Sequence, residues 1–253
     1  MAFVECRIRG FDALADSFGH DPTTLTKWVR RVVTALIEPV QAAEGAVAVL
    51  FPGGFSAYFP MPDYARQACT AALAMIAAAD TLNQTSEPPV AIGVGVAIGV
   101  GILGDFGTES RLLFAAIGSG ANVAAALAKT SSRYGVAVLF APMAPESAEQ
   151  PFAMLQVDTL TGAGGRTVPL YTLLPPPLTR GHPKFLALNV FHGRILDACR
   201  AREWQHAKES IAQARTLSGA NGLLYDLYLE RIAYYELHPP AEDWPGTLLE
   251  VHF

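Results

Sequence analysis

The sequence predicts an α+β fold in which helices pack on a sheet of mostly antiparallel strands. Three observations carry this prediction. Residues 2–9 alternate as in a strand, residues 22–45 place apolar side chains at helical spacing, and residues 47–59 resemble two strands joined by a turn. Because 51% of the 253 residues are hydrophobic, the chain can also fill a sizeable core.

The first long helix is predicted from its start signal. Asp21 suits the N-cap position and Pro22 the first helical position. Apolar side chains then recur every three or four residues as far as Val40, and Gly45 ends the helix. The stretch VAVLFPGGFSAYF that follows is typical of a β-hairpin, because apolar runs flank a Pro-Gly-Gly corner, yet it contains no charged residue. An Ala-rich helix is predicted over residues 63–83.

Residues 90–103 predict one long strand or a pair of strands with glycines on one face, where another backbone can approach closely. A helix over residues 119–134 follows. Short strands near residues 136–140, 152–158 and 168–174 complete this part of the chain. The order of these elements indicates a ferredoxin-like sandwich.

A Pro-rich break at residues 173–183 precedes three predicted helices, near residues 185–201, 204–218 and 222–236. We therefore divide the chain into a sandwich domain over 1–175, a linker over 176–183 and an all-α extension over 184–253. The extension is similar to little more than one tetratricopeptide repeat. Since stable stacks of such repeats need about three, we expect it to pack on the main domain or on a partner protein.

Composition excludes several classes of protein. A net charge of −5 without a long basic run argues against nucleic-acid binding. The three cysteines match neither a disulfide framework nor a metal motif, which indicates reduced thiols and a cytoplasmic location. The longest apolar run, Val90 to Leu103, is shorter than the roughly 20 residues that a membrane-spanning helix needs, so we expect no span.

From about Phe3 to Leu174 the sequence resembles the catalytic domain of class III adenylate and guanylate cyclases. Five motifs carry the resemblance, in the order and at the spacing of the family: IRGF (Ile8–Phe11), EGAVAVLFPGGFSAYF (Glu44–Phe59), IGVGVAIG (Ile92–Gly99), GDFG (Gly104–Gly107) and AIGSGANVAAAL (Ala116–Leu127). The last part of the chain is similar to the short helical extension of some bacterial cyclases, with YLERI, Pro239-Pro240 and Asp243-Trp244.

In active members of this family, two aspartates hold two Mg²⁺ ions that activate the ribose hydroxyl and neutralise the phosphates. The resemblance places the first aspartate at Arg7 and the second at Gly53. A guanidinium at ~4 Å would repel a divalent ion by roughly 8 kcal/mol at an effective dielectric of about 20. We therefore expect no metal or other cofactor. The backbone around both positions is expected to be intact, so that restoring the two aspartates would restore metal affinity.

The other family positions are also changed. The resemblance places the base-reading residues at Val49 and Leu113 and the phosphate-stabilising arginine at Ala126. Asn122 alone matches, at the position that contacts the ribose. The resemblance thus implies a catalytically degenerate cyclase that serves as a signalling and interaction module. It also implies a homodimer through the head-to-tail face on which active relatives form their sites.

Two alternatives stay open. An active adenylate or guanylate cyclase, producing cyclic nucleotide and pyrophosphate with Mg²⁺ or Mn²⁺, would need relocated ligands such as Glu5 or Asp105. An ion pair between Glu5 and a nearby arginine, and a turn-stabilising role for Asp105, fit the sequence better. A small-molecule sensor would instead use the emptied, more apolar cleft around Val49, Leu113 and Ala126.

Overall fold

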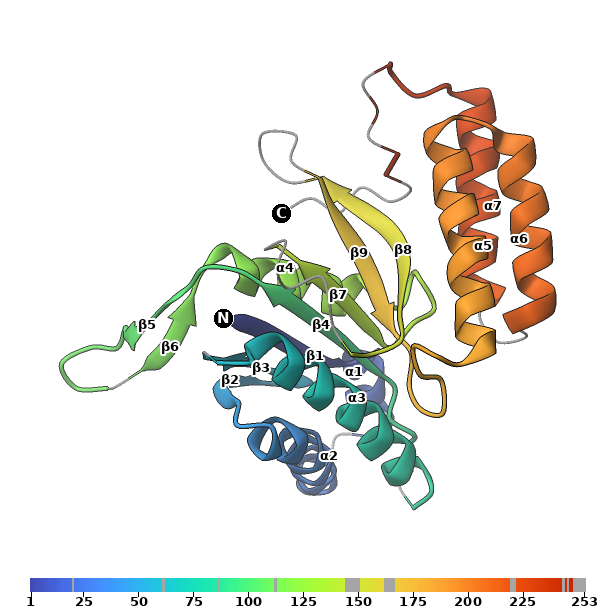
Figure 1. Ribbon diagram of the computed structural model, residues 1–253. Helices are drawn as coiled ribbons and strands as arrows, with labels where there is room; N and C mark the ends of the chain where they lie inside the picture. The colour runs from blue at the N-terminus through green and yellow to red at the C-terminus, as the bar shows by residue number, and fades with distance from the viewer. Residues whose placement is uncertain are drawn as a thin grey trace.

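The computed structural model shows a central sheet with helices on both faces, a projecting two-stranded arm and a group of helices beside one sheet edge (Figure 1). It describes residues 1–19, 21–60, 62–85, 87–111, 113–143, 151–161, 167–218, 222–242, 244 and 246–247.

The central sheet has seven strands in the order β2-β3-β1-β4-β7-β9-β8. Among the described strands, only β4 and β7 pair in parallel, and the chain crosses between them through helix α4. The predicted antiparallel-rich sheet is therefore confirmed. The strands are β1 (Ala2–Ile8), β2 (Ala46–Phe51), β3 (Gly54–Phe59), β4 (Ile92–Ile98), β7 (Val138–Pro142), β8 (Met154–Thr161) and β9 (Thr167–Leu173).

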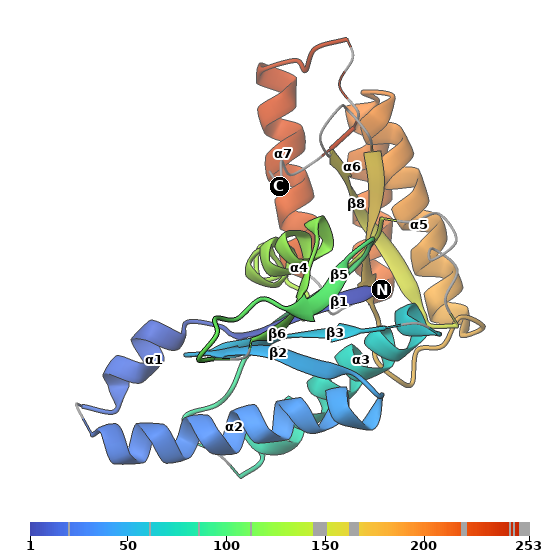
Figure 2. The same cartoon turned by 90° about the vertical axis from the view of Figure 1, so that its left-hand side faces the viewer.

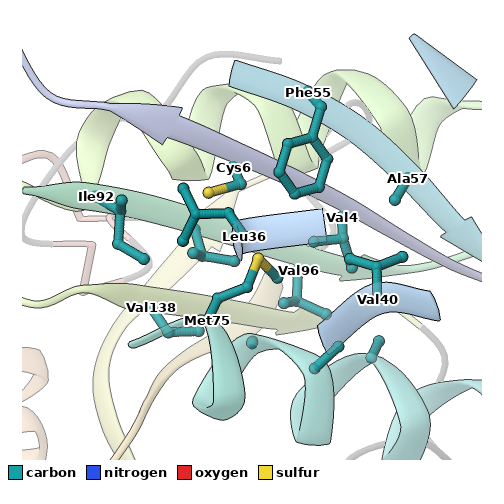
Figure 3. Close-up of a cluster of buried hydrophobic side chains, with 14 of the residues drawn as sticks. Val4, Cys6, Leu36, Val40, Phe55, Ala57, Met75, Ile92, Val96 and Val138 are labelled. Carbon is teal, nitrogen blue, oxygen red and sulfur yellow. The ribbon is translucent and has the colours of Figure 1, made fainter. Parts of the chain in front are cut away.

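The two faces of the sheet bury separate cores. Helices α2 (Pro22–Ala42) and α3 (Tyr64–Asn83) cover one face, and α4 (Ser119–Thr130) covers the other (Figure 2). Alternate residues of β1 divide between them: Val4 and Cys6 lie with Leu36 and Met75 in the first core (Figure 3), whereas Phe3 lies in the second. The predicted α+β sandwich is therefore the observed fold.

The start of α2 follows the sequence signal. The Asp21 carboxylate accepts hydrogen bonds from the backbone N–H groups of Thr23 and Thr24, at 3.0 and 3.1 Å. The preceding short helix α1 (Phe11–Ser17) was not predicted, because its seven residues are too few to show a helical period.

The glycines of β4 face α4, which packs directly on the strand. A Cβ atom at Gly93 would meet the Ala128 carbonyl oxygen, and one at Gly95 would meet that of Ala124, both at less than 3.0 Å. The expected close approach of another backbone is therefore confirmed, and it occurs within the chain.

Helix α4 ends at Thr130, four residues before the predicted end at 134. The chain turns there because Tyr134 is fully buried and its hydroxyl donates to the Asp158 carboxylate of β8 at 2.7 Å. Gly135, with φ +64°, completes the turn. Tertiary hydrogen bonding thus overrides a sequence that continues in helical character.

A second, two-stranded sheet of β5 (Ile102–Asp105) and β6 (Phe114–Ile117) projects from the domain as an arm (Figure 1). It follows β4, so the segment over residues 90–103 is a pair of strands rather than one. Large apolar side chains at Val100, Ile102 and Phe114 are exposed there.

The extension consists of α5 (Pro183–Arg200), α6 (Trp204–Ser218) and α7 (Gly222–Leu237). It packs on the main domain beside β8, where Val157 and Ile195 belong to one buried cluster and the Tyr228 hydroxyl donates to the Val157 carbonyl at 2.6 Å. Within the described ranges, none of the helices is both long and apolar enough to cross a bilayer.

Candidate functional site

The two positions that the resemblance assigns to metal ligands lie side by side at one end of β1. Arg7 pairs with Gly54 in the β1–β3 register, and the Ile8 N–H donates to the Gly53 carbonyl at 2.7 Å. The strand and the hairpin therefore bring residues distant in sequence to one place.

Arg7 is held from two sides. Its Nε donates to a carboxylate oxygen of Glu5 at 2.5 Å, and its Cζ lies 4.8 Å from the centre of the Phe51 ring. Glu5 is 7% exposed and points to the same face of β1 as Arg7. The Glu5 carboxylate, which was suggested as a relocated metal ligand, is thus paired with the Arg7 guanidinium, at the position of the family's first metal-binding aspartate.

Gly53 has a conformation that opposes a side chain. Its φ is +79°, and a Cβ atom there would lie 2.6 Å from Cγ and 2.9 Å from Cβ of Phe11. An aspartate at this corner would adopt a left-handed backbone and would displace Phe11. The expected gain of metal affinity on restoring both aspartates stays a prediction, and at Gly53 it requires Phe11 to move.

The residues present do not fit a pair of divalent ions. One position carries a cation and the other has no side chain, whereas Mg²⁺ needs oxygen ligands in near-octahedral geometry. Across the part of the chain that the structure describes, no three His, Cys, Asp or Glu side chains are grouped so as to hold a metal.

Asp105 stabilises the arm. One carboxylate oxygen accepts hydrogen bonds from the backbone N–H groups of Leu113, at 2.8 Å, and Gly107, at 2.9 Å. These bonds hold the pKa of the Asp105 carboxyl below its usual value. This is the geometry expected of a turn-stabilising aspartate.

A small cleft of about 170 Å³ opens beside Glu5, between β1, β3 and the first turn of α4. Its polar groups include Glu5, Ser56 and Asn122, and alanines make up much of the remaining lining. Asn122, which matches the family residue at its position, therefore lines the same cleft as Glu5.

The other three family positions do not line this cleft. Val49 and Leu113 are 43% and 45% exposed, and Ala126 is half-buried. Their neighbours Ala48, Ala116 and Ala125 line it instead. The ligand cleft expected around Val49, Leu113 and Ala126 is therefore not this one and stays a prediction.

Sequence reasoning missed the two aromatic residues that shape the site. Phe11 covers the hairpin corner, and Phe51 stacks on the Arg7 guanidinium. Their only sequence signal is position, because Phe11 belongs to the IRGF motif and Phe51 immediately precedes the Pro-Gly-Gly corner.

Solved structures of cyclase domains share this fold. The adenylyl cyclase CyaB from P. aeruginosa matches 71% of this chain and 96% of its own, with 19% identity and a TM-score of 0.58. The guanylate cyclase domain of RhGC from Catenaria anguillulae, solved in complex with GTP, matches 69% of this chain and 95% of its own, with 13% identity and a TM-score of 0.57.

A bacterial light-regulated adenylyl cyclase matches 68% of this chain, with 18% identity and a TM-score of 0.58. The match covers 51% of that protein, so this chain spans about half its length. No family model matches the sequence, and no curated protein matches it. The matches to solved structures show that the chain has the fold of a class III adenylyl/guanylyl cyclase catalytic domain.

Proposed function

We propose that this chain is a catalytically degenerate cyclase domain that acts as a dimeric signalling and interaction module. The observation that carries the proposal is the Arg7–Glu5 ion pair at the position of the first metal ligand. It places a permanent positive charge where the family's chemistry needs a cation-binding carboxylate.

The same pair argues against an active cyclase with relocated ligands. For Glu5 to bind a divalent ion, its carboxylate must leave a guanidinium 2.5 Å away, and that guanidinium must move aside. The hairpin corner offers no second carboxylate, because Gly53 stands there under the Phe11 ring. Neither metal required for in-line attack has a ligand set at these two positions.

Dimerisation is supported by exposed apolar side chains on β2 and the arm. Val49 is 43% exposed, and Ile102, Phe114 and Ile117 are also exposed. Exposed large apolar side chains of this kind are typical of protein interfaces. We place the interface on this side of the molecule, as a symmetric pair of head-to-tail contacts.

We expect the protein to be located in the cytoplasm because all three cysteines are buried and free.

A ligand-sensing role is the second candidate, favoured by the cleft beside Glu5. Its volume of about 170 Å³ suits only a small molecule, and Ser56 and Asn122 supply neutral polar contacts. A molecule bound there would contact β1, β3 and α4 together and so bias the packing of the domain.

Nucleotide turnover tests the proposal. The purified chain is incubated with ATP or GTP and Mg²⁺ or Mn²⁺, and cyclic nucleotide is measured against a denatured control. We expect no product above the control and a dimer by light scattering at tens of micromolar, where a ~1 µM complex forms. Cyclic nucleotide production that is abolished by Glu5→Ala would show relocated ligands, and a monomer at that concentration would contradict the dimer.

A further inference from the structure

A second, larger groove lies on the other side of the hairpin, between α2 and the β2–β3 corner. Its volume is about 480 Å³, and it shares no lining residue with the cleft beside Glu5. One wall is the hairpin tip, formed by Leu50, Phe51 and Pro52.

Helix α2 supplies two parallel rows of side chains to this groove. Val29, Val33 and Ile37 form the floor and are half-buried. Thr26, Arg30 and Thr34 form the rim and are exposed. Both rows have four-residue spacing, so each follows one line along the helix. The groove is therefore apolar at its base and on the hairpin side, and polar with one positive charge on the helix side.

The charge on the rim is available. Among the described residues, the Arg30 guanidinium has no hydrogen-bond or ion-pair partner, whereas the adjacent Arg31 donates to the Thr85 hydroxyl at 2.7 Å. An unpaired guanidinium beside an apolar floor is complementary to an anion carried on an apolar body.

We propose that this groove binds a small anionic amphiphile, a carboxylate on a medium-length apolar chain. The carboxylate pairs with Arg30, and the apolar chain lies on Val29, Val33 and Ile37 against the hairpin tip. A volume of about 480 Å³ is in the range of small-molecule sites, roughly 300–1,000 Å³. The proposal does not depend on the loss of cyclase activity, since no metal or substrate position lines the groove.

Occupancy of the groove is linked to the degenerate site through Phe51. This residue lines the groove, and its ring also carries the Arg7 guanidinium. A ligand that restrains the hairpin tip therefore also restrains the Phe51 ring, on which the Arg7 guanidinium packs.

The test uses decanoate as the probe on the full chain with ¹³C-labelled Ile, Leu and Val methyl groups. We expect saturable shifts of the methyl signals of Val29, Val33, Ile37 and Leu50 below the micellar concentration of decanoate. Decanol, which has the same chain without the charge, should bind equally well to the wild type and to a variant that lacks the Arg30 charge, because only the carboxylate pairs with the guanidinium.

Three variants locate the charge. Arg30→Gln should weaken decanoate binding about fivefold, and Thr34→Asp should do the same because its carboxylate is four residues from Arg30 and pairs with it. Arg31→Gln is the matched control and should bind as the wild type does. All three positions are exposed, so the fold is retained, and the methyl spectrum of each free variant verifies this.

Three results would overturn the proposal. Decanoate binding that is unchanged in Arg30→Gln, or weakened there no more than decanol binding, would show that Arg30 does not recognise the charge. Shifts centred on the arm, at Val100, Ile102 and Ile117, would show general apolar adsorption. Groove signals that move on dilution of the protein alone would show that a second copy of the chain, rather than a small anion, covers the groove.

Discussion

The Arg7–Glu5 pair predicts a specific pattern in a double-mutant cycle. The Glu5 side chain is 9% exposed and that of Arg7 is 33% exposed, with 2.5 Å between the charged atoms. Arg7→Met keeps the aliphatic stem beside Phe51 but leaves a nearly buried carboxylate unpaired. Breaking a fully buried pair costs about 3–5 kcal/mol, and because water reaches Arg7, we expect a loss of ~1–3 kcal/mol here.

Glu5→Gln removes the charge that Arg7→Met leaves unpaired. The double variant Glu5→Gln/Arg7→Met should therefore be more stable than the sum of the single changes predicts, by about 1 kcal/mol. Urea unfolding of the four proteins, with their m-values compared, measures this coupling. Additivity within about 0.3 kcal/mol would refute the reasoning, because it would mean that Glu5 is not committed to Arg7 and is available as a ligand.

Two further predictions concern the packing of α4 on β4 and the buried His192 of α5, which packs on Tyr225 and Tyr228 of α7. Gly95→Ala should destabilise the protein by ~3 kcal/mol because the new Cβ would collide with the Ala124 carbonyl oxygen. Gly99→Ala is the control: its Cβ would have no neighbour nearer than 3.9 Å, so the change in stability should stay within about 1 kcal/mol. Equal losses of stability in thermal unfolding would contradict the close packing of α4 on β4. Burial lowers the pKa of His192 to about 4. As the pH falls below about 6.5, the unfolded chain therefore takes up a proton that the folded chain does not. The free energy of unfolding should fall by up to ~3 kcal/mol towards pH 4. His192→Gln should flatten that part of the profile, and an unchanged profile in urea titrations would refute this role.

The sequence predicted the sheet, the hairpin and the main helices because each has a local signal. The N-cap at Asp21, the Pro-Gly-Gly corner and the alternation in β1 act over a few residues, and the structure follows them. Helix α4 was predicted too long because its end depends on a hydrogen bond from Tyr134 to Asp158, which no local pattern records. The register of β1 against β3, which brings Arg7 to the hairpin, was not predicted, because it depends on strand pairing that no local pattern records.

The site was less predictable than the fold. A carboxylate two residues before Arg7 was enough to suggest an ion pair, and the structure contains it. The left-handed corner at Gly53 under Phe11 was not predictable, because the sequence does not show which ring covers a turn. The groove between α2 and the hairpin tip was missed for a similar reason, since it depends on where two separately predicted elements lie relative to each other.

The central claim is that the Arg7 guanidinium stands where active relatives have a metal-binding carboxylate. Calorimetry with Mn²⁺ on the wild type and on Arg7→Asp tests this claim most directly. We predict no binding to the wild type at millimolar Mn²⁺. The variant should gain measurable affinity, because the introduced carboxylate and the released Glu5 would present oxygen ligands on one face of β1. Binding of Mn²⁺ to the wild type that is lost in Glu5→Gln would contradict the account.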